Sequence, residues 1–167
     1  MNYDRPQELL KPVKRRFITL TFVVALALEL LPLPQGSNRW LPDFVALLIL
    51  YWSVNQPRRI GIGMAFGIGL LADVVSTSMF GQHALAYSVG AYLILLRQQQ
   101  LVMFNLGQQT LVILVLMMLI QLLMAVARWS VGASLPGLGY FLPALIGALL
   151  WPLLTKLMLL PYRSERH

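Results

Sequence analysis

The chain has 167 residues, of which 58% are hydrophobic and only 11% charged, with a mean hydropathy of +0.71. A soluble domain would carry about 25% charged residues, so the composition predicts an integral membrane protein with one compact membrane domain. The absence of cysteine excludes disulfides, thiolate nucleophiles and cysteine-based metal sites, and the formal charge of +7 does not indicate nucleic-acid binding because the basic residues lie between apolar runs.

Six apolar runs follow one another along the chain, and each predicts a helix that crosses the bilayer. They cover residues 17–33, 41–54, 60–75, 83–96, 106–127 and 140–160. The second and third are short for a hydrocarbon core of about 30 Å, so they either extend into flanking turns or form one re-entrant hairpin. The expected fold is therefore an all-α, compact bundle of six transmembrane helices that occupies residues 17–160.

The basic residues predict the orientation of this bundle, because lysine and arginine concentrate in cytoplasmic loops. If the runs alternate in direction, eleven of the 13 basic residues share one side and only Arg39 and Arg128 lie on the other. Both ends are then cytoplasmic: a basic segment at 1–16 and a tail at 161–167. The basic start also imitates a signal peptide, but the apolar run continues beyond the small residues Ala25 and Ala27, which favours an uncleaved anchor.

Four ionisable residues lie within or at the ends of the runs, all toward the outer side: Glu29, Asp43, Asp73 and His83. A centred carboxylate costs roughly 2.5–3.5 kcal/mol on insertion scales, so these side chains need partners, water or each other. Arg39 and Arg128 are expected on the same side, where a guanidinium group offsets the desolvation of a carboxylate. The sequence therefore predicts a polar cluster at the outer end.

Each of these residues also has a purely structural interpretation. Asp43 follows Pro42 and is typical of a helix N-cap. Asp73 closes its run, where the helix macrodipole disfavours negative charge, so it indicates a partner or a role in helix pairing. Glu29 is too deep to reach the interface and needs an internal hydrogen bond, a partner chain or a neutral carboxyl. A lone histidine such as His83 is more often packed and hydrogen-bonded than functional.

The third run contains the candidate helix-packing residues Gly63, Gly67 and Gly69. Gly63 and Gly67 are four residues apart, share a helix face and form a small-xxx-small surface on which another helix can pack closely. That helix belongs either to the same bundle or to a partner. The nearby pair Gly61 and Gly63 is no dinucleotide fingerprint, because the third glycine is misplaced and no strand precedes it.

No motif for catalysis accompanies these residues. The chain has no nucleophile elbow, no zinc-binding His-Glu-x-x-His helix and no phosphate-binding glycine loop. It has two histidines, one of them His167 at the end of the chain. We therefore expect no catalytic residue, no metal and no cofactor, and a protein that binds other molecules without converting them.

A series of short motifs lies in a fixed order between residues 40 and 92. They are Pro42-Asp43, Leu50-Tyr51-Trp52, Pro57-Arg58, Gly67-x-Gly69-Leu70-Leu71-x-Asp73, Gly81-x-His83-Ala84 and Tyr92, with Leu150-Trp151-Pro152 near the last run. Together, in a basic-ended chain of this length, they resemble the MreD family of rod shape-determining proteins. The order of the runs matches the family over nearly the whole chain, whereas the second half is otherwise generic apolar sequence.

The resemblance implies a non-catalytic, multi-pass subunit of the bacterial inner membrane, required for rod shape and lateral peptidoglycan synthesis in the cell-elongation complex. The implied partners are the MreC scaffold, a penicillin-binding transpeptidase, a SEDS glycan polymerase and, indirectly, an actin-like filament. The family fold is likened to the substrate-binding subunit of energy-coupling-factor transporters, which keeps small-molecule binding or transport open as an alternative. An intramembrane enzyme is the third possibility. The residues favour docking of partner helices on small-residue faces, fixed by polar contacts.

Overall fold

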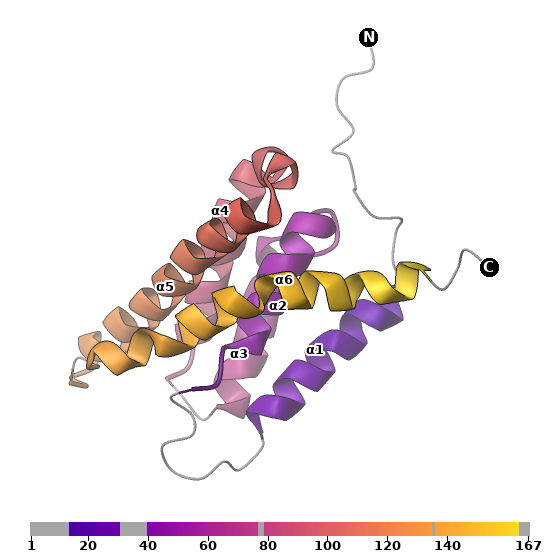
Figure 1. Ribbon diagram of the computed structural model, residues 1–167. Helices are drawn as coiled ribbons and strands as arrows, with labels where there is room; N and C mark the ends of the chain where they lie inside the picture. The colour runs from indigo at the N-terminus through magenta and orange to yellow at the C-terminus, as the bar shows by residue number, and fades with distance from the viewer. Residues whose placement is uncertain (1–13, 31–39, 77–78, 135, 164–167) are drawn as a thin grey trace.

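A computed structural model describes residues 14–30, 40–76, 79–134 and 136–163 (Figure 1). Six α-helices and one 3₁₀ turn account for most of these residues, and no strand occurs among them. The helices are α1 (Arg15–Glu29), α2 (Phe44–Asn55), α3 (Ile62–Val75), α4 (Gln82–Met103), α5 (Leu106–Ser130) and α6 (Leu142–Arg163), with the 3₁₀ turn η2 (Leu138–Phe141) before α6. The all-α prediction is confirmed.

Each of these helices overlaps one apolar run of the sequence, and the largest difference between predicted and observed ends is at the end of α4. This helix continues to Met103, seven residues beyond the predicted end, because arginine and glutamine are good helix formers although they are polar. The end of the first run, the loop with Arg39 and most of the two terminal segments lie outside the described residues.

Within the described ranges, two segments are long and apolar enough to cross a membrane: α5, with a hydropathy of 2.8, and Leu138–Met158, which comprises η2 and most of α6, with a hydropathy of 1.7. α2 and α3 are apolar but have only 12 and 14 residues. At about 1.5 Å per residue they are roughly 18 and 21 Å long, well short of a 30 Å hydrocarbon core. A six-span arrangement remains a prediction.

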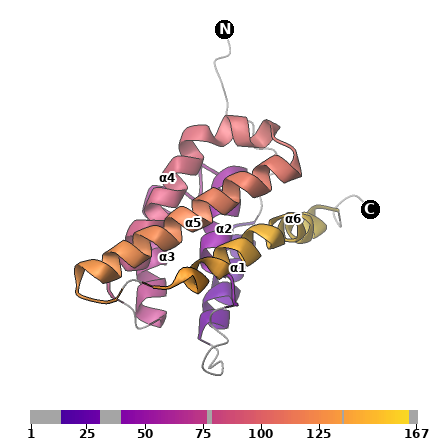
Figure 2. The ribbon, with the colours of Figure 1, turned by 60° about the vertical axis from the view of Figure 1, so that its left-hand side comes forward.

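α2 is the centre of the core. All ten residues from Val45 to Val54 are buried, because this helix carries apolar side chains on every side and must be covered all round. α1, α4 and α6 pack against it, α3 packs on α4, and α5 lies between α4 and α6. Figures 1 and 2 show α4 and α5 side by side and α6 crossing over α2.

Two side chains of α4 bond to the two ends of α2. The Tyr87 hydroxyl donates to Asp43 Oδ2 at 2.7 Å, and Gln98 Nε2 donates to the carbonyl oxygen of Val54 at 3.0 Å. Eleven residues separate the two bonded positions on each helix, about 16.5 Å in both cases. The two helices therefore run in the same direction and are tied at both ends.

Candidate functional site

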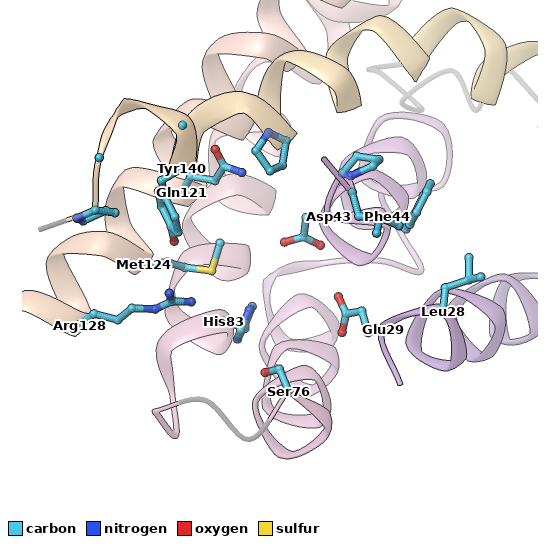
Figure 3. Close-up of a pocket in the computed structure, with 16 residues that line it drawn as sticks. Leu28, Glu29, Asp43, Phe44, Ser76, His83, Gln121, Met124, Arg128 and Tyr140 are labelled. Carbon is cyan, nitrogen blue, oxygen red and sulfur yellow. The ribbon is translucent and has the colours of Figure 1, made fainter. Parts of the chain in front are cut away.

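A cavity of about 660 Å³ lies at one end of the bundle, where all six helices contribute a terminus (Figure 3). Glu29 is the last residue of α1, Asp43 precedes α2, Ser76 follows α3, His83 is in the first turn of α4, Arg128 is near the end of α5, Tyr140 is in η2, and Pro143 is at the start of α6. The chain alternates in direction, so helix ends far apart in sequence meet here. Four of the five predicted polar residues line this one space.

Asp43 lies on one wall of the cavity as the N-cap of α2. Its Oδ1 accepts the backbone N–H of Ala46 at 2.8 Å, and its Oδ2 accepts the Tyr87 hydroxyl at 2.7 Å. An aspartate cap satisfies an orphan N–H of the first turn, and negative charge is favourable at a helix N-terminus. Asp43 therefore joins the start of α2 to the second turn of α4.

Asp73 lies behind the cavity, at the joint between α3 and α4. Its two oxygens accept backbone N–H groups of Gly81 at 2.8 Å, His83 at 2.9 Å and Ala84 at 3.4 Å. The ring Nδ1 of His83 lies 2.8 Å from Asp73 Oδ1. Since an ionised carboxylate only accepts hydrogen bonds, Nδ1 is the donor in this pair.

This arrangement explains why an acid is retained at the end of α3, where the macrodipole of that helix disfavours it. The carboxylate lies at the N-terminus of α4, which is the positive end of that helix's dipole, and accepts hydrogen bonds from the first backbone N–H groups there. Gly81 cannot cap α4 with a side chain, and its φ of +93° is a left-handed conformation that glycine adopts without strain. Asp73 is thus a cap supplied from the neighbouring helix.

Arg128 lies on the opposite wall of the cavity from Glu29 (Figure 3). Its Nε donates to Gln82 Oε1 at 3.1 Å, and its guanidinium carbon is 5.5 Å from the centre of the Tyr140 ring. Within the described ranges, no carboxylate comes within ion-pair distance of it. The guanidinium is held in place by an amide and an aromatic ring, and its charge is not neutralised by an acid there.

Glu29 and Gln121 differ from the other polar residues of the cavity. Glu29 Oε2 and Gln121 Oε1 are both buried atoms that accept no hydrogen bond from the part of the chain that the structure describes. The Gln121 side chain is 5% exposed and comes from the interior of α5. Unsatisfied buried oxygens are costly, so a pair of them lining one cavity calls for an explanation.

The glycines of α3 divide into two groups. A Cβ added to Gly69 would lie 2.4 Å from the Cα of Ala84, so this glycine lets α3 and α4 touch backbone to backbone. Gly63 and Gly67 have nothing within 4 Å of such a Cβ and lie on the exposed side of the helix. Gly69 packs inside the bundle, and the face with Gly63 and Gly67 is open.

Two residues of the site were missed at the sequence level. Tyr87 lies four residues after His83, one helical turn along the same face, and this spacing was a usable signal. Gln121 is the sole polar residue between Val112 and Ala127, and a polar residue inside a strongly apolar run is itself unusual. Among the described residues, no group of three histidine, cysteine or acidic side chains is placed to hold a metal ion.

The helices and this polar end define a small, all-helical protein with apolar segments of membrane-spanning length and a cluster of polar and charged side chains at one end. The family described as rod shape-determining protein MreD matches residues 13–160. The rod shape-determining protein MreD of Haemophilus influenzae is 33% identical over 137 residues, covering 82% of this chain and 85% of that protein. The chain belongs to the MreD family. No solved structure matches it.

Membership in this family confirms the resemblance drawn from the motifs between residues 40 and 92. It assigns the chain to the membrane proteins that determine rod shape, and hence to a role in cell shape. The family is one of shape-determining proteins and not a known family of enzymes.

Proposed function

We propose that this protein is a non-catalytic, multi-pass subunit of the bacterial cell-elongation complex that docks the transmembrane helices of its partners. The first partner is the MreC scaffold, followed by a penicillin-binding transpeptidase and a SEDS glycan polymerase, with an actin-like filament linked indirectly. Family membership supports the role in cell shape, and the open glycine face of α3 is the observation that carries the docking mechanism.

The open face of α3 has the shape that close helix packing needs. Gly63 and Gly67 leave a strip of bare backbone one turn long, and Met64 and Phe66 flank it with side chains 52% and 48% exposed. Small residues between larger ones let a second helix approach until the backbones touch, and this packing drives helix association in lipid. α3 packs chiefly on α4, which leaves this side available to a partner.

Docking is tested by filling the bare strip. Replacing both Gly63 and Gly67 by leucine should leave the fold unchanged, since open space surrounds both positions, and should remove the scaffold from complexes purified out of native membrane. Val115→Phe is the matched control, because it adds bulk to an exposed position on α5. Equal scaffold recovery and normal rod shape with the double variant would remove the α3 face from the proposal.

The topology is a separate part of the proposal: both termini in the cytoplasm and the cavity end facing outward. The chain has no cysteine, so single cysteines can report on it. A membrane-impermeant maleimide should label Ala133→Cys in intact spheroplasts and Gln99→Cys only after the membrane is opened; both positions are exposed. The reverse labelling pattern would invert the proposed orientation.

A further inference from the structure

The cavity contains hydrogen-bond acceptors that the fold itself does not satisfy. Glu29 Oε2 and Gln121 Oε1 are buried, line the cavity and accept no hydrogen bond from the described residues. Leaving a buried polar group unsatisfied is costly, and more so for a charged one. Gln121 is more than nine-tenths buried, so bulk water does not readily meet its need.

The charges of the cavity are separated across it. Figure 3 shows the carboxylates of Glu29 and Asp43 on the side of α1 and α2, and Arg128 reaching in from α5, with Met124 and His83 between them. Asp43 has neutral partners, Ala46 and Tyr87, and Arg128 has neutral partners, Gln82 and Tyr140. Within the described ranges, the carboxylates of Glu29 and Asp43 on one wall and the guanidinium of Arg128 on the other therefore form no direct ion pair.

We infer that this cavity binds a zwitterionic head group that carries a primary ammonium and a phosphate, the chemistry of phosphoethanolamine. The ammonium donates to Glu29 beside the charge of Asp43, on the wall opposite α5. The phosphate accepts from the guanidinium of Arg128, a geometry for which arginine is well suited. A volume of about 660 Å³ is within the usual range for small-molecule sites.

A primary ammonium fits this cavity better than a quaternary one. It brings three N–H donors, whereas a trimethylammonium group has none and leaves the Glu29 oxygen unsatisfied. Sites for quaternary ammonium are cages of aromatic rings, and here Phe44 and Tyr140 are the aromatic residues of the lining. The binding site is independent of the open face of α3, because neither Gly63 nor Gly67 lines the cavity.

Two sources could supply this head group. Phosphatidylethanolamine would enter from the bilayer, and the apolar side chains of Leu28, Leu41 and Phe44 would line the path of its glycerol and first methylenes. Free phosphoethanolamine would enter from the aqueous side. The test therefore uses both probes.

The experiment titrates the full chain, purified in detergent, with dihexanoyl phosphatidylethanolamine, dihexanoyl phosphatidylcholine and free phosphoethanolamine, using calorimetry. We expect the ethanolamine lipid to bind at least tenfold more tightly than the choline lipid. Binding of the free compound with similar affinity would assign the site to a soluble ligand. Binding of the lipid alone would assign it to the bilayer, and both results support the site.

Three variants test the assignment of groups. Gln121→Met keeps the volume and removes a buried acceptor of the cavity, Glu29→Gln removes the charge beside the ammonium, and Arg128→Gln removes the phosphate partner. Glu29→Gln and Arg128→Gln should each weaken binding of the ethanolamine lipid about tenfold, and Gln121→Met should weaken it less. Glu29→Gln should also narrow the difference in affinity between the ethanolamine and choline lipids. Lys156→Gln is the control, because Lys156 is exposed and outside the cavity.

The unfolding midpoint of each variant, measured without lipid, shows whether it is folded. Arg128→Gln changes an exposed side chain and serves if Glu29→Gln does not fold. Equal affinity for the two lipids would overturn the inference. So would wild-type affinity in folded Glu29→Gln or Arg128→Gln, or the absence of binding by both ethanolamine probes.

Discussion

Two acids at the polar end of this protein have opposite surroundings. At the α3–α4 joint, Asp73 accepts three backbone N–H groups and the ring of His83. At the end of α1, Glu29 places a buried oxygen on the cavity wall with no hydrogen bond from the described residues. The fold supplies hydrogen-bond donors to Asp73, whereas Glu29 Oε2 is available to a donor from a molecule that enters the cavity.

The contrast separates acids whose hydrogen bonds stabilise the bundle from acids that are available to bind another molecule. A satisfied carboxylate contributes to stability, and removing it leaves its donors buried and unpaired. An unsatisfied one costs stability and is retained for another purpose. Stability measurements on matched substitutions therefore test the comparison directly.

Asp73→Ala should have the largest effect. It leaves three N–H groups and the His83 ring without their acceptor, and breaking a buried pair of this kind costs about 3–5 kcal/mol. Equilibrium unfolding in mixed micelles measures the loss. Asp73→Asn keeps the shape and one acceptor oxygen, so it should lower the free energy of unfolding less than Asp73→Ala does. Equal stability of the wild type and both variants would contradict the role of Asp73 as a cap of α4.

Gly69→Ala should come next, with a loss of about 3 kcal/mol from overpacking, because its Cβ would lie 2.4 Å from the backbone of Ala84. Gly67→Ala is the control on the same helix. Its Cβ meets open space, and alanine favours a helix over glycine by about 1 kcal/mol, so this variant should be slightly more stable than the wild type. A similar loss in both would mean that α3 does not touch α4 at Gly69.

Asp43→Ala should cost about 2 kcal/mol, since it removes the N-cap of α2 and leaves the buried Tyr87 hydroxyl unpaired. Tyr87→Phe removes only the hydroxyl and should cost about 1 kcal/mol. In a double-mutant cycle, the two changes should cost less together than the sum of the singles. Strict additivity would show that the Asp43–Tyr87 bond contributes nothing.

Glu29→Gln should have the smallest effect, within about 0.5 kcal/mol of the wild type or slightly stabilising. The substitution removes a buried charge and breaks no hydrogen bond found at Oε2. The same unfolding assay measures it. A loss as large as that of Asp73→Ala would show that Glu29 belongs to the framework of the bundle and would end the contrast between the two acids.

The sequence predicted the helices well because each one needs an apolar run, and it predicted the polar end because acids are unusual in such runs. It predicted the N-cap bond of Asp43 but not the hydrogen bonds that join one helix to another. The closeness of Asp73 to the start of α4 depends on the turn at Gly81, whose conformation leaves no periodic signal. The different roles of Gly67 and Gly69 depend on which side of α3 faces α4, and two positions two residues apart lie on different sides of a helix.

Gln121 illustrates a second limit. A single amide in the apolar run of α5 can face lipid, a neighbouring helix or a cavity, and only the packing of α4 and α6 against α5 decides among these. The sequence shows that such a residue is unusual. It contains no information on how much space lies in front of it.

The bonds from Tyr87 to Asp43 and from Gln98 to Val54 have a consequence for the evolution of this chain. The bonded positions are equally spaced on the two helices: Asp43 and Val54 on α2, Tyr87 and Gln98 on α4. One residue inserted or deleted between the two positions on one helix would therefore shift a donor or an acceptor by about 1.5 Å along the axis and rotate it by about 100°. Relatives that keep these bonds should therefore change the length of both helices together or of neither.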